Sequence, residues 1–252
     1  MTKDNFMKPI ILHIPHSSTY IPTFEGYVLP NEAIEEEILK LTDWYTDDLF
    51  DSPTDILVKA DFSRVFCDAE RFADDSQEIM AKYGMGVLYE KTDDGKTLRQ
   101  VNPDLRKRIL KEYYWLHHQK LGLEVQKQLL KWGQSLIIDC HSFPSIPLNR
   151  DLNKELNRPD FNIGTDPYHT PQILIDRATT FFSAKGYSLG IDWPYRGSIV
   201  PMEYYQNNKM VSSIMLEINR KLYLKEPTNE KSENYPEMKR VVNEFLKVIR
   251  QC

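Results

Sequence analysis

The stretch Ser135-Leu-Ile-Ile-Asp-Cys-His141 decides the fold class of the chain. Its apolar centre predicts a buried strand, and its polar end places Asp139 and His141 two residues apart, on one face of that strand. A second apolar run, Pro9-Ile-Ile-Leu-His-Ile-Pro15, has the same character. Because strands this apolar are covered on both faces, the two runs predict a sheet buried inside a layered α/β domain.

Segments of helical periodicity alternate with the apolar runs. Short apolar runs predict further strands at 56–58, at 65–67, just after 186–190 and at 213–218. Apolar positions at helical spacing predict helices from Asn31 to the Ser52-Pro53 stop, and over 103–132, 171–185 and 236–251. The alternation predicts one domain over residues 1–252, a three-layer α/β/α fold with a mixed, mostly parallel sheet.

The composition excludes several classes of protein. The chain has 252 residues, 41% of them hydrophobic, so it can fill a core and is not intrinsically disordered. No run approaches the roughly 20 apolar residues of a membrane helix, and the first residues lack the apolar stretch of a signal peptide. A net charge of -5 argues against nucleic-acid binding. We therefore expect a cytoplasmic protein without nucleic-acid or membrane partners, of open oligomeric state.

Polar residues lie at the ends of three predicted strands. His16 follows the first run, Asp139 and His141 end the second, and Glu217 lies within the run at 213–218. Ligands of α/β sheets bind beyond the carboxyl ends of the strands. Two imidazoles together with carboxylates predict a catalytic zinc with nitrogen and oxygen ligands and one open position for water. A nearby glutamate then serves as the base for that water.

A pair of carboxylates lies in the first expected helix. Asp43 and Asp47 are four residues apart, so a continuous helix places them on one face, at the border of its apolar stripe. At least one of them is then expected to point inward, where a carboxylate needs a cation or a network of donors. A solvated face, which suits Asp48, is the alternative.

Arginines form a second group of candidates. Arg64 and Arg71 bracket the run at 65–67, Arg196 lies in an expected turn, and Arg220 follows the last run. Arginine binds carboxylates through two parallel hydrogen bonds, so several arginines near a metal suit a small anionic substrate. The alternative for each is a structural ion pair, such as one between Arg71 and its neighbour Asp68.

The remaining histidines have simpler interpretations. His117 and His118 are adjacent in the long expected helix and therefore lie on different faces, which favours structural roles. His169 lies in a loop with no supporting motif. His13 lies inside the first strand, on the opposite face from His16 by strict alternation, which predicts a place in the core or behind a ligand.

Six motifs occur in a fixed order over most of the chain, from about residue 11 to residue 223. They are Ile14-Pro-His-Ser-Ser18, Thr42-Asp-Trp-Tyr-Thr-Asp-Asp-Leu49, Ser63-Arg-Val-Phe-Cys-Asp-Ala-Glu-Arg71, Asp139-Cys-His-Ser-Phe143, Pro194-Tyr-Arg-Gly197 and Leu216-Glu-Ile-Asn-Arg220. No motif is specific alone, but in this order they resemble the N-formylglutamate amidohydrolase (N-formylglutamate deformylase) family. That family is similar in fold to zinc carboxypeptidases and aspartoacylases, which implies a zinc-exopeptidase-like fold here.

The resemblance implies a zinc-dependent hydrolase with one zinc per chain, its catalytic domain spanning the whole sequence. Such an enzyme splits N-formyl-L-glutamate into formate and L-glutamate, a late step of one route of histidine degradation. The residues that the motifs imply are, by role, the metal ligands His16, His141 and Asp43 (with Asp47 as the rival), the general base Glu217, and the carboxylate-binding Arg71 with Arg64 in support.

Further residues complete the expected site. Arg64 helps to stabilise the tetrahedral oxyanion, and Asp139 orients the imidazole of His141. The expected substrate contacts are Ser17, Arg64, Arg71, Arg196, Asn219 and Arg220. The departures from the family pattern are Glu70 in place of an asparagine, Ser198 in place of a glycine, and Thr19 where carboxypeptidases have glutamate. Glu70 would repel a substrate carboxylate if it faced the pocket.

Other functions remain open from the sequence. The nearest is a zinc amidase of the same fold that acts on another N-acyl amino acid or a small peptide. A serine hydrolase using Ser17 or Ser142 lacks the Gly-x-Ser-x-Gly elbow and an evident base. A binding protein that has kept only the fold is more remote, because His16, His141 and Glu217 are all present.

Overall fold

A six-stranded sheet forms the centre of the molecule. The computed structural model describes residues 8–251, and the strands follow the order β2-β1-β3-β6-β4-β5. The strands are β1 (Ile11–Ile14), β2 (Ile56–Lys59), β3 (Ser135–Phe143), β4 (Phe161–Gly164), β5 (Leu189–Ile191) and β6 (Val211–Asn219). Neighbouring strands pair in parallel except β4 and β6, which are antiparallel. The prediction of a mixed, mostly parallel sheet is confirmed.

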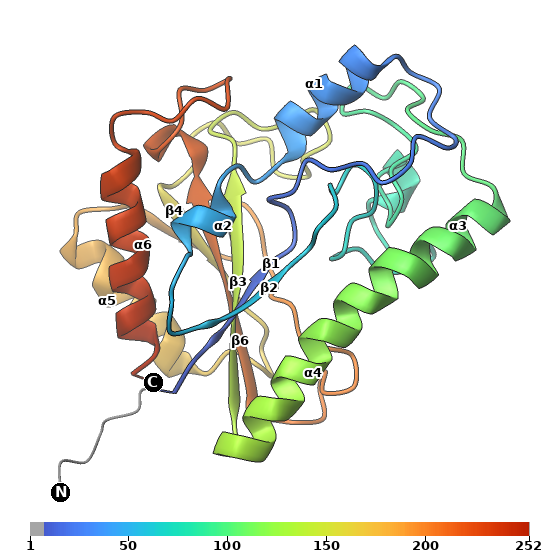
Figure 1. The fold of residues 1–252 in the computed structure, drawn as a ribbon. Coiled ribbons are helices and arrows are strands. Elements are labelled where there is room, and N and C mark those ends of the chain that lie inside the picture. Colours follow the sequence, from blue (N-terminus) through green and yellow to red (C-terminus); the bar gives the residue numbers. More distant parts are fainter. Residues whose placement is uncertain (1–7, 252) are drawn as a thin grey trace, which may run out of the picture.

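Helices cover both faces of this sheet. In Figure 1, α5 and α6 lie against one face and the long α4 lies against the other. The α-helices are α1 (Asn31–Leu41), α2 (Thr46–Leu49), α3 (Pro103–Ile109), α4 (Trp115–Trp132), α5 (Gln172–Ala184) and α6 (Tyr235–Ile249). The predicted three-layer α/β/α fold is therefore confirmed. Within residues 8–251, no helix is both long and apolar enough to cross a membrane.

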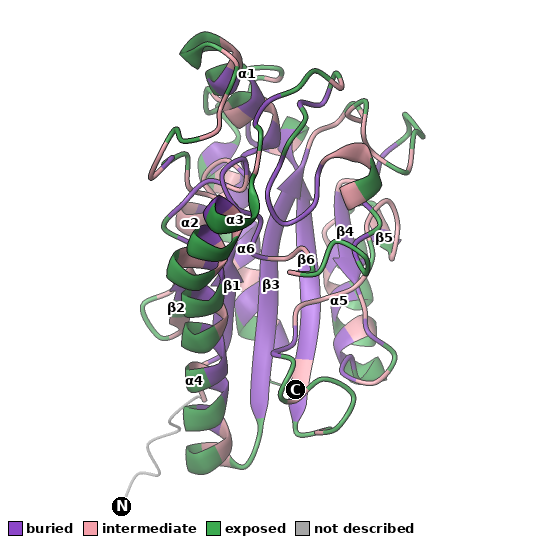
Figure 2. Ribbon diagram, turned by 90° about the vertical axis from the view of Figure 1, so that its right-hand side faces the viewer, coloured by how far each residue is buried: buried purple, intermediate pink, exposed green. Residues whose placement is uncertain are grey.

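The layer between the sheet and the pair α5 and α6 is built on stacked aromatic rings. Phe182 of α5 lies between Phe161 of β4 and Phe245 of α6, with ring centroids 4.2 and 5.2 Å apart, and all three side chains are buried. Figure 2 shows the central strands β3 and β6 buried along nearly all of their length and helices exposed on their outer faces. Every residue of β3 is buried, as expected for a strand covered on both faces.

The first expected helix stops earlier than its periodicity indicates. α1 ends at Leu41, and Tyr45 adopts a left-handed conformation (φ 61°) before α2 begins. The backbone N–H of Asp43 donates to the carbonyl of His16 at 3.0 Å, which holds this turn against the chain after β1. Asp43 and Asp47 therefore do not share a helix face, and that expectation is wrong. Periodicity alone does not reveal a break that a tertiary hydrogen bond fixes.

Other elements differ in smaller ways. Residues 65–67 form a turn and not a strand, because the N–H groups of Phe66 and Cys67 donate to the carbonyl of Ser63. The long helix expected over 103–132 contains a π-helical turn, Leu110–Tyr114, between α3 and α4. β4 escapes prediction because four residues give too short a pattern.

Phe182→Ala tests the aromatic layer. The substitution removes a ring that stacks on two others, so we expect the free energy of unfolding to fall by about 3–5 kcal/mol. Urea denaturation followed by circular dichroism measures the change. The control is Leu130→Ala on α4, where the side chain is 83% exposed and a change within about 0.5 kcal/mol is expected. Similar losses in both variants would contradict this placement of the core.

Candidate active site

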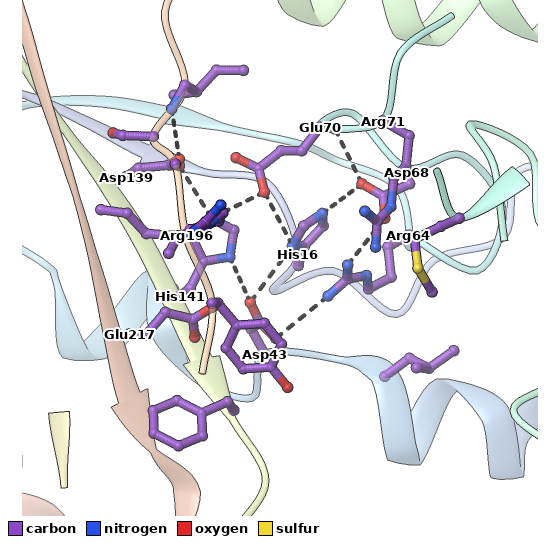
Figure 3. A pocket seen from close by; sticks show the side chains of 18 of the residues that line it. His16, Asp43, Arg64, Asp68, Glu70, Arg71, Asp139, His141, Arg196 and Glu217 are labelled. Carbon is purple, nitrogen blue, oxygen red and sulfur yellow. Dashed lines mark hydrogen bonds and ion pairs between the residues drawn. The ribbon is translucent and has the colours of Figure 1, made fainter. Parts of the chain in front are cut away.

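A pocket of about 450 Å³ opens at the carboxyl ends of β1, β3 and β6. His16 follows β1, His141 lies near the end of β3, and Glu217 of β6 is the register partner of His141. All three line the pocket, so the structure brings these predicted residues together. Figure 3 shows them surrounded by further carboxylates and arginines.

The two imidazoles of the pocket are both held by carboxylates. The rings of His16 and His141 lie with their centroids 5.1 Å apart. Nε2 of His16 is 2.8 Å from Oδ1 of Asp68, and Nε2 of His141 is 3.1 Å from Oδ1 of Asp139. A carboxylate that accepts from Nε2 fixes the ring and its tautomer, an arrangement typical of histidine metal ligands. Among residues 8–251, buried Nδ1 of His16 has no hydrogen-bond partner.

Asp43 lies where the Nδ1 atoms of both rings point. Its Oδ2 is 3.0 Å from Nδ1 of His141 and 3.6 Å from Nδ1 of His16. Its Oδ1 accepts from Nη2 of Arg220 at 3.0 Å. Burial opposes ionisation of this carboxyl, but the hydrogen bond from His141 and the nearby imidazole of His16 hold its pKa well below the usual range. Asp43 thus keeps one ionised oxygen beside both imidazoles, a position that suits a third metal ligand.

Glu70 is a second carboxylate beside the imidazoles. Its Oε2 lies 3.0 Å from Nε2 of His141 and 3.8 Å from Nδ1 of His16. Ligand atoms of His16, Glu70 and His141 all lie within 4.8 Å of one another, as a metal site requires. The sequence marked Glu70 as a departure from the family pattern, but not as a possible ligand. The structure shows that it faces the pocket (Figure 3).

Glu217 has the burial and the raised pKa of a proton-transfer group. The side chain is almost fully buried, and its Oε2 has no hydrogen-bond partner among residues 8–251. Burial raises the pKa of Glu217 to about 8, while the neighbouring His141 acts in the opposite direction. An unpartnered carboxylate of raised pKa in a pocket is typical of a general acid or base.

The arginines of the pocket differ in how firmly they are engaged. Nη2 of Arg64 donates to Asp68 at 3.0 Å, and its Nε donates to Tyr89 at 3.3 Å. Arg71 lies farther from Asp68, at 3.6 Å, and its buried Nε lacks a hydrogen-bond partner among residues 8–251. Arg196 lines the pocket with an exposed side chain. Arg71 and Arg196 are therefore the cations most available to an anionic substrate.

Several predicted residues lie outside the pocket. Asp47 pairs with Lys59 at 3.1 Å, so the structure does not bring it to the imidazoles. Asn219 is buried and its amide donates to the carbonyl of Pro159, which is a structural role. Ser17 is half-buried and does not line the cavity. Arg220 does line the pocket, but its guanidinium donates a hydrogen bond to Asp43.

A layer of polar residues beneath the pocket was not expected. His13 of β1 is the register partner of Asp139, and its Nδ1 lies 2.8 Å from Oδ1 of that carboxylate. Nε2 of His13 lies 2.8 Å from Nε2 of His117, on α4. His13 thus lies behind His141, as one of its two interpretations held. His117 has more than a simple packing role, and only the fold reveals it, because these residues are far apart in the chain.

Comparison with known proteins gives consistent matches. The family model for N-formylglutamate amidohydrolase matches residues 8–224. The N-formylglutamate deformylases of Pseudomonas aeruginosa and Pseudomonas putida are 25% and 26% identical over 228 residues, 86% of this chain and 83% and 82% of theirs. The crystal structure of N-formylglutamate amidohydrolase from Ralstonia eutropha JMP134 has a TM-score of 0.84 at 23% identity, over 96% of this chain and 93% of that one. Gene product Atu2144 from Agrobacterium tumefaciens has a TM-score of 0.70 at 13% identity, over 97% and 89%.

The fold, the pocket and these relatives define the class of the protein. It is a hydrolase that acts on an amide bond. The two solved structures are less than 25% identical and support the fold alone. The family model covers most of the chain, so the chain belongs to the N-formylglutamate amidohydrolase family. The family resemblance read from the six motifs is confirmed.

Proposed function

We propose that the enzyme hydrolyses N-formyl-L-glutamate to formate and L-glutamate with one zinc ion at the pocket. The observation that supports a zinc site is the pair of imidazoles. In each, Nε2 lies within hydrogen-bond distance of a carboxylate, and Nδ1 faces Asp43. The buried Nδ1 of His16, which has no hydrogen-bond partner among residues 8–251, suits a metal ligand atom. We propose His16, His141 and Asp43 as ligands, because Oδ2 of Asp43 lies beside both Nδ1 atoms.

The chemistry divides between the metal and the protein. A bound zinc ion supplies Lewis acidity and lowers the pKa of water to about 7. Glu217 accepts a proton from the attacking water and returns it to the leaving amine. Asp139 keeps the His141 ring oriented, and Arg64 adds a positive charge near the developing oxyanion.

The substrate is proposed from the charge of the pocket and the names of the relatives. The deformylases named above act on N-formylglutamate, a substrate with two carboxylates. Arg71 and Arg196 line the cavity. The Nε–H of Arg71 has no hydrogen-bond partner among residues 8–251, and the side chain of Arg196 is exposed. Because guanidinium groups bind carboxylates in a fixed two-bond geometry, two such groups suit a dicarboxylate. We further propose a single catalytic domain over 1–252, a cytoplasmic location and a place in histidine degradation.

A second candidate function rests on the size and lining of the cavity. About 450 Å³ exceeds what a formyl group and a glutamate fill, and it lies within the usual range of small-molecule sites. Phe72, Met202 and Tyr205 line it with exposed apolar surface. These residues favour a substrate with a larger apolar acyl group or side chain, cleaved by the same machinery.

Formate release from N-formyl-L-glutamate by the purified protein tests the first proposal. We expect activity that disappears with a chelator and returns with zinc. Glu217→Gln should keep bound zinc and lose about 10²–10⁴ in kcat, because the proton acceptor is gone. A Glu217→Gln enzyme with unchanged kcat would remove Glu217 from this role. Zinc-restored cleavage of longer N-acyl amino acids but not of N-formyl-L-glutamate would favour the second candidate.

Arg71→Ala tests carboxylate binding. Loss of a charged hydrogen bond costs about 1.5–3 kcal/mol, so KM for N-formyl-L-glutamate should rise about ten- to hundredfold. KM for an N-formyl amino acid with a neutral side chain should change much less. The control is Arg177→Ala, which removes an exposed arginine of α5 outside the cavity. Equal changes of KM for both substrates in Arg71→Ala would argue against recognition of the side-chain carboxylate.

A further inference from the structure

Glu70 presents its two oxygens to two different groups of donors. Oε2 faces His141 and His16, whereas Oε1 lies 3.7 Å from Nδ1 of His13. Oδ1 of Asp139 lies 2.8 Å from the same nitrogen. Ligand atoms of His13, Glu70 and Asp139 lie within 4.8 Å of one another and form a second group that shares Glu70 with the first. In Figure 3, Glu70 reaches into the space between Asp139 and His16.

The charges of this second group are not balanced by arginine or lysine. The arginines closest to the imidazoles pair with two other carboxylates, Asp68 and Asp43. Among residues 8–251, Glu70 and Asp139 form ion pairs with histidines alone. The side chains of His13 and Asp139 are 1% and 2% exposed and that of Glu70 is 20% exposed, so water does little to compensate the charge of Asp139. Two carboxylates that share imidazoles and have no arginine or lysine partner suit a bound metal cation.

His13 is held in an orientation that suits a ligand. Its Nε2 lies 2.8 Å from Nε2 of His117, and its Nδ1 faces Asp139. With a metal ion bound, the Nε2–H of His13 would donate to His117, and Nδ1 would offer its lone pair on the side of the carboxylates, as in a metal-bound imidazole.

We propose that His13, Asp139 and Glu70 bind a second divalent metal ion, and that Glu70 bridges it to the ion between His16 and His141. Separations of 2.8 and 3.7 Å between the donors fit ligands around one ion with bonds of about 2.0–2.2 Å. Two-metal sites hold their ions about 3.5–4 Å apart, a span that one carboxylate bridges. The proposed hydrolysis needs a single zinc, so this second site goes beyond it.

Metal stoichiometry tests the second site. Zinc is titrated into the metal-free full-length protein by calorimetry, and bound zinc is counted by elemental analysis after gel filtration. We expect two equivalents for the unmodified protein and one for His13→Gln. The matched control is His118→Gln, because this neighbouring imidazole of α4 bonds to the carbonyl of Ala69 and should leave both equivalents. One equivalent in the unmodified protein, or two in His13→Gln, would overturn the proposal.

Cobalt tests the bridge through Glu70. With two Co²⁺ ions bound, electron paramagnetic resonance should show a magnetically coupled pair, and His13→Gln should show an isolated ion. Two uncoupled ions in the unmodified protein would overturn the bridge. Failure of the proposed function gives a different result: two bound equivalents without formate release leave the second site standing, whereas formate release with one equivalent overturns the second site alone.

Discussion

Buried carboxylates at the carboxyl ends of the strands impose the constraint on which the site depends. Each needs a cation, because an uncompensated charge in the interior costs several kcal/mol. Arg220 forms an ion pair with Asp43 at 3.0 Å, and Arg64 forms one with Asp68 at 3.0 Å. These pairs fix the two carboxylates that in turn face His16. The orientation of the imidazole rings therefore follows from these ion pairs. The carboxylates around the rings outnumber the arginines that pair with them, which favours binding of a cation from solution.

The sheet decides which of these groups meet. Parallel pairing places His13 beside Asp139 and His141 beside Glu217, so four polar side chains share one region. A shift of the register by one residue would turn each pair to opposite faces, which the apolar neighbours of β3 prevent. The same alternation that builds the core therefore positions Glu217, the proposed proton acceptor, next to an imidazole.

The strand ends could be predicted because their signal is local. An apolar run that ends in histidine needs no knowledge of its partner, and β3 and β6 lie close to the ranges the sequence indicates. The place of Asp43 could not be derived from periodicity, because a hydrogen bond to the carbonyl of His16 sets it. Glu70 escaped prediction for a similar reason. Its turn is fixed by Asp68, whose N–H donates to Val87 and whose side chain accepts from the N–H of Glu70.

Glu70 connects the proposed substrate of the enzyme to its proposed metal content. Glu70 has imidazoles but no arginine or lysine as partners, and a carboxylate there would repel a dicarboxylate by about 4 kcal/mol at 4 Å in a partly screened site. Arg71 does not cancel it, since its guanidinium lies near Asp68 and Glu78. A cation bound between Glu70 and the histidines would neutralise this repulsion. Glu70 would then act as a metal ligand and no longer oppose binding of the substrate. Recognition of the proposed anionic substrate and occupation of the proposed metal sites would therefore depend on the same carboxylate.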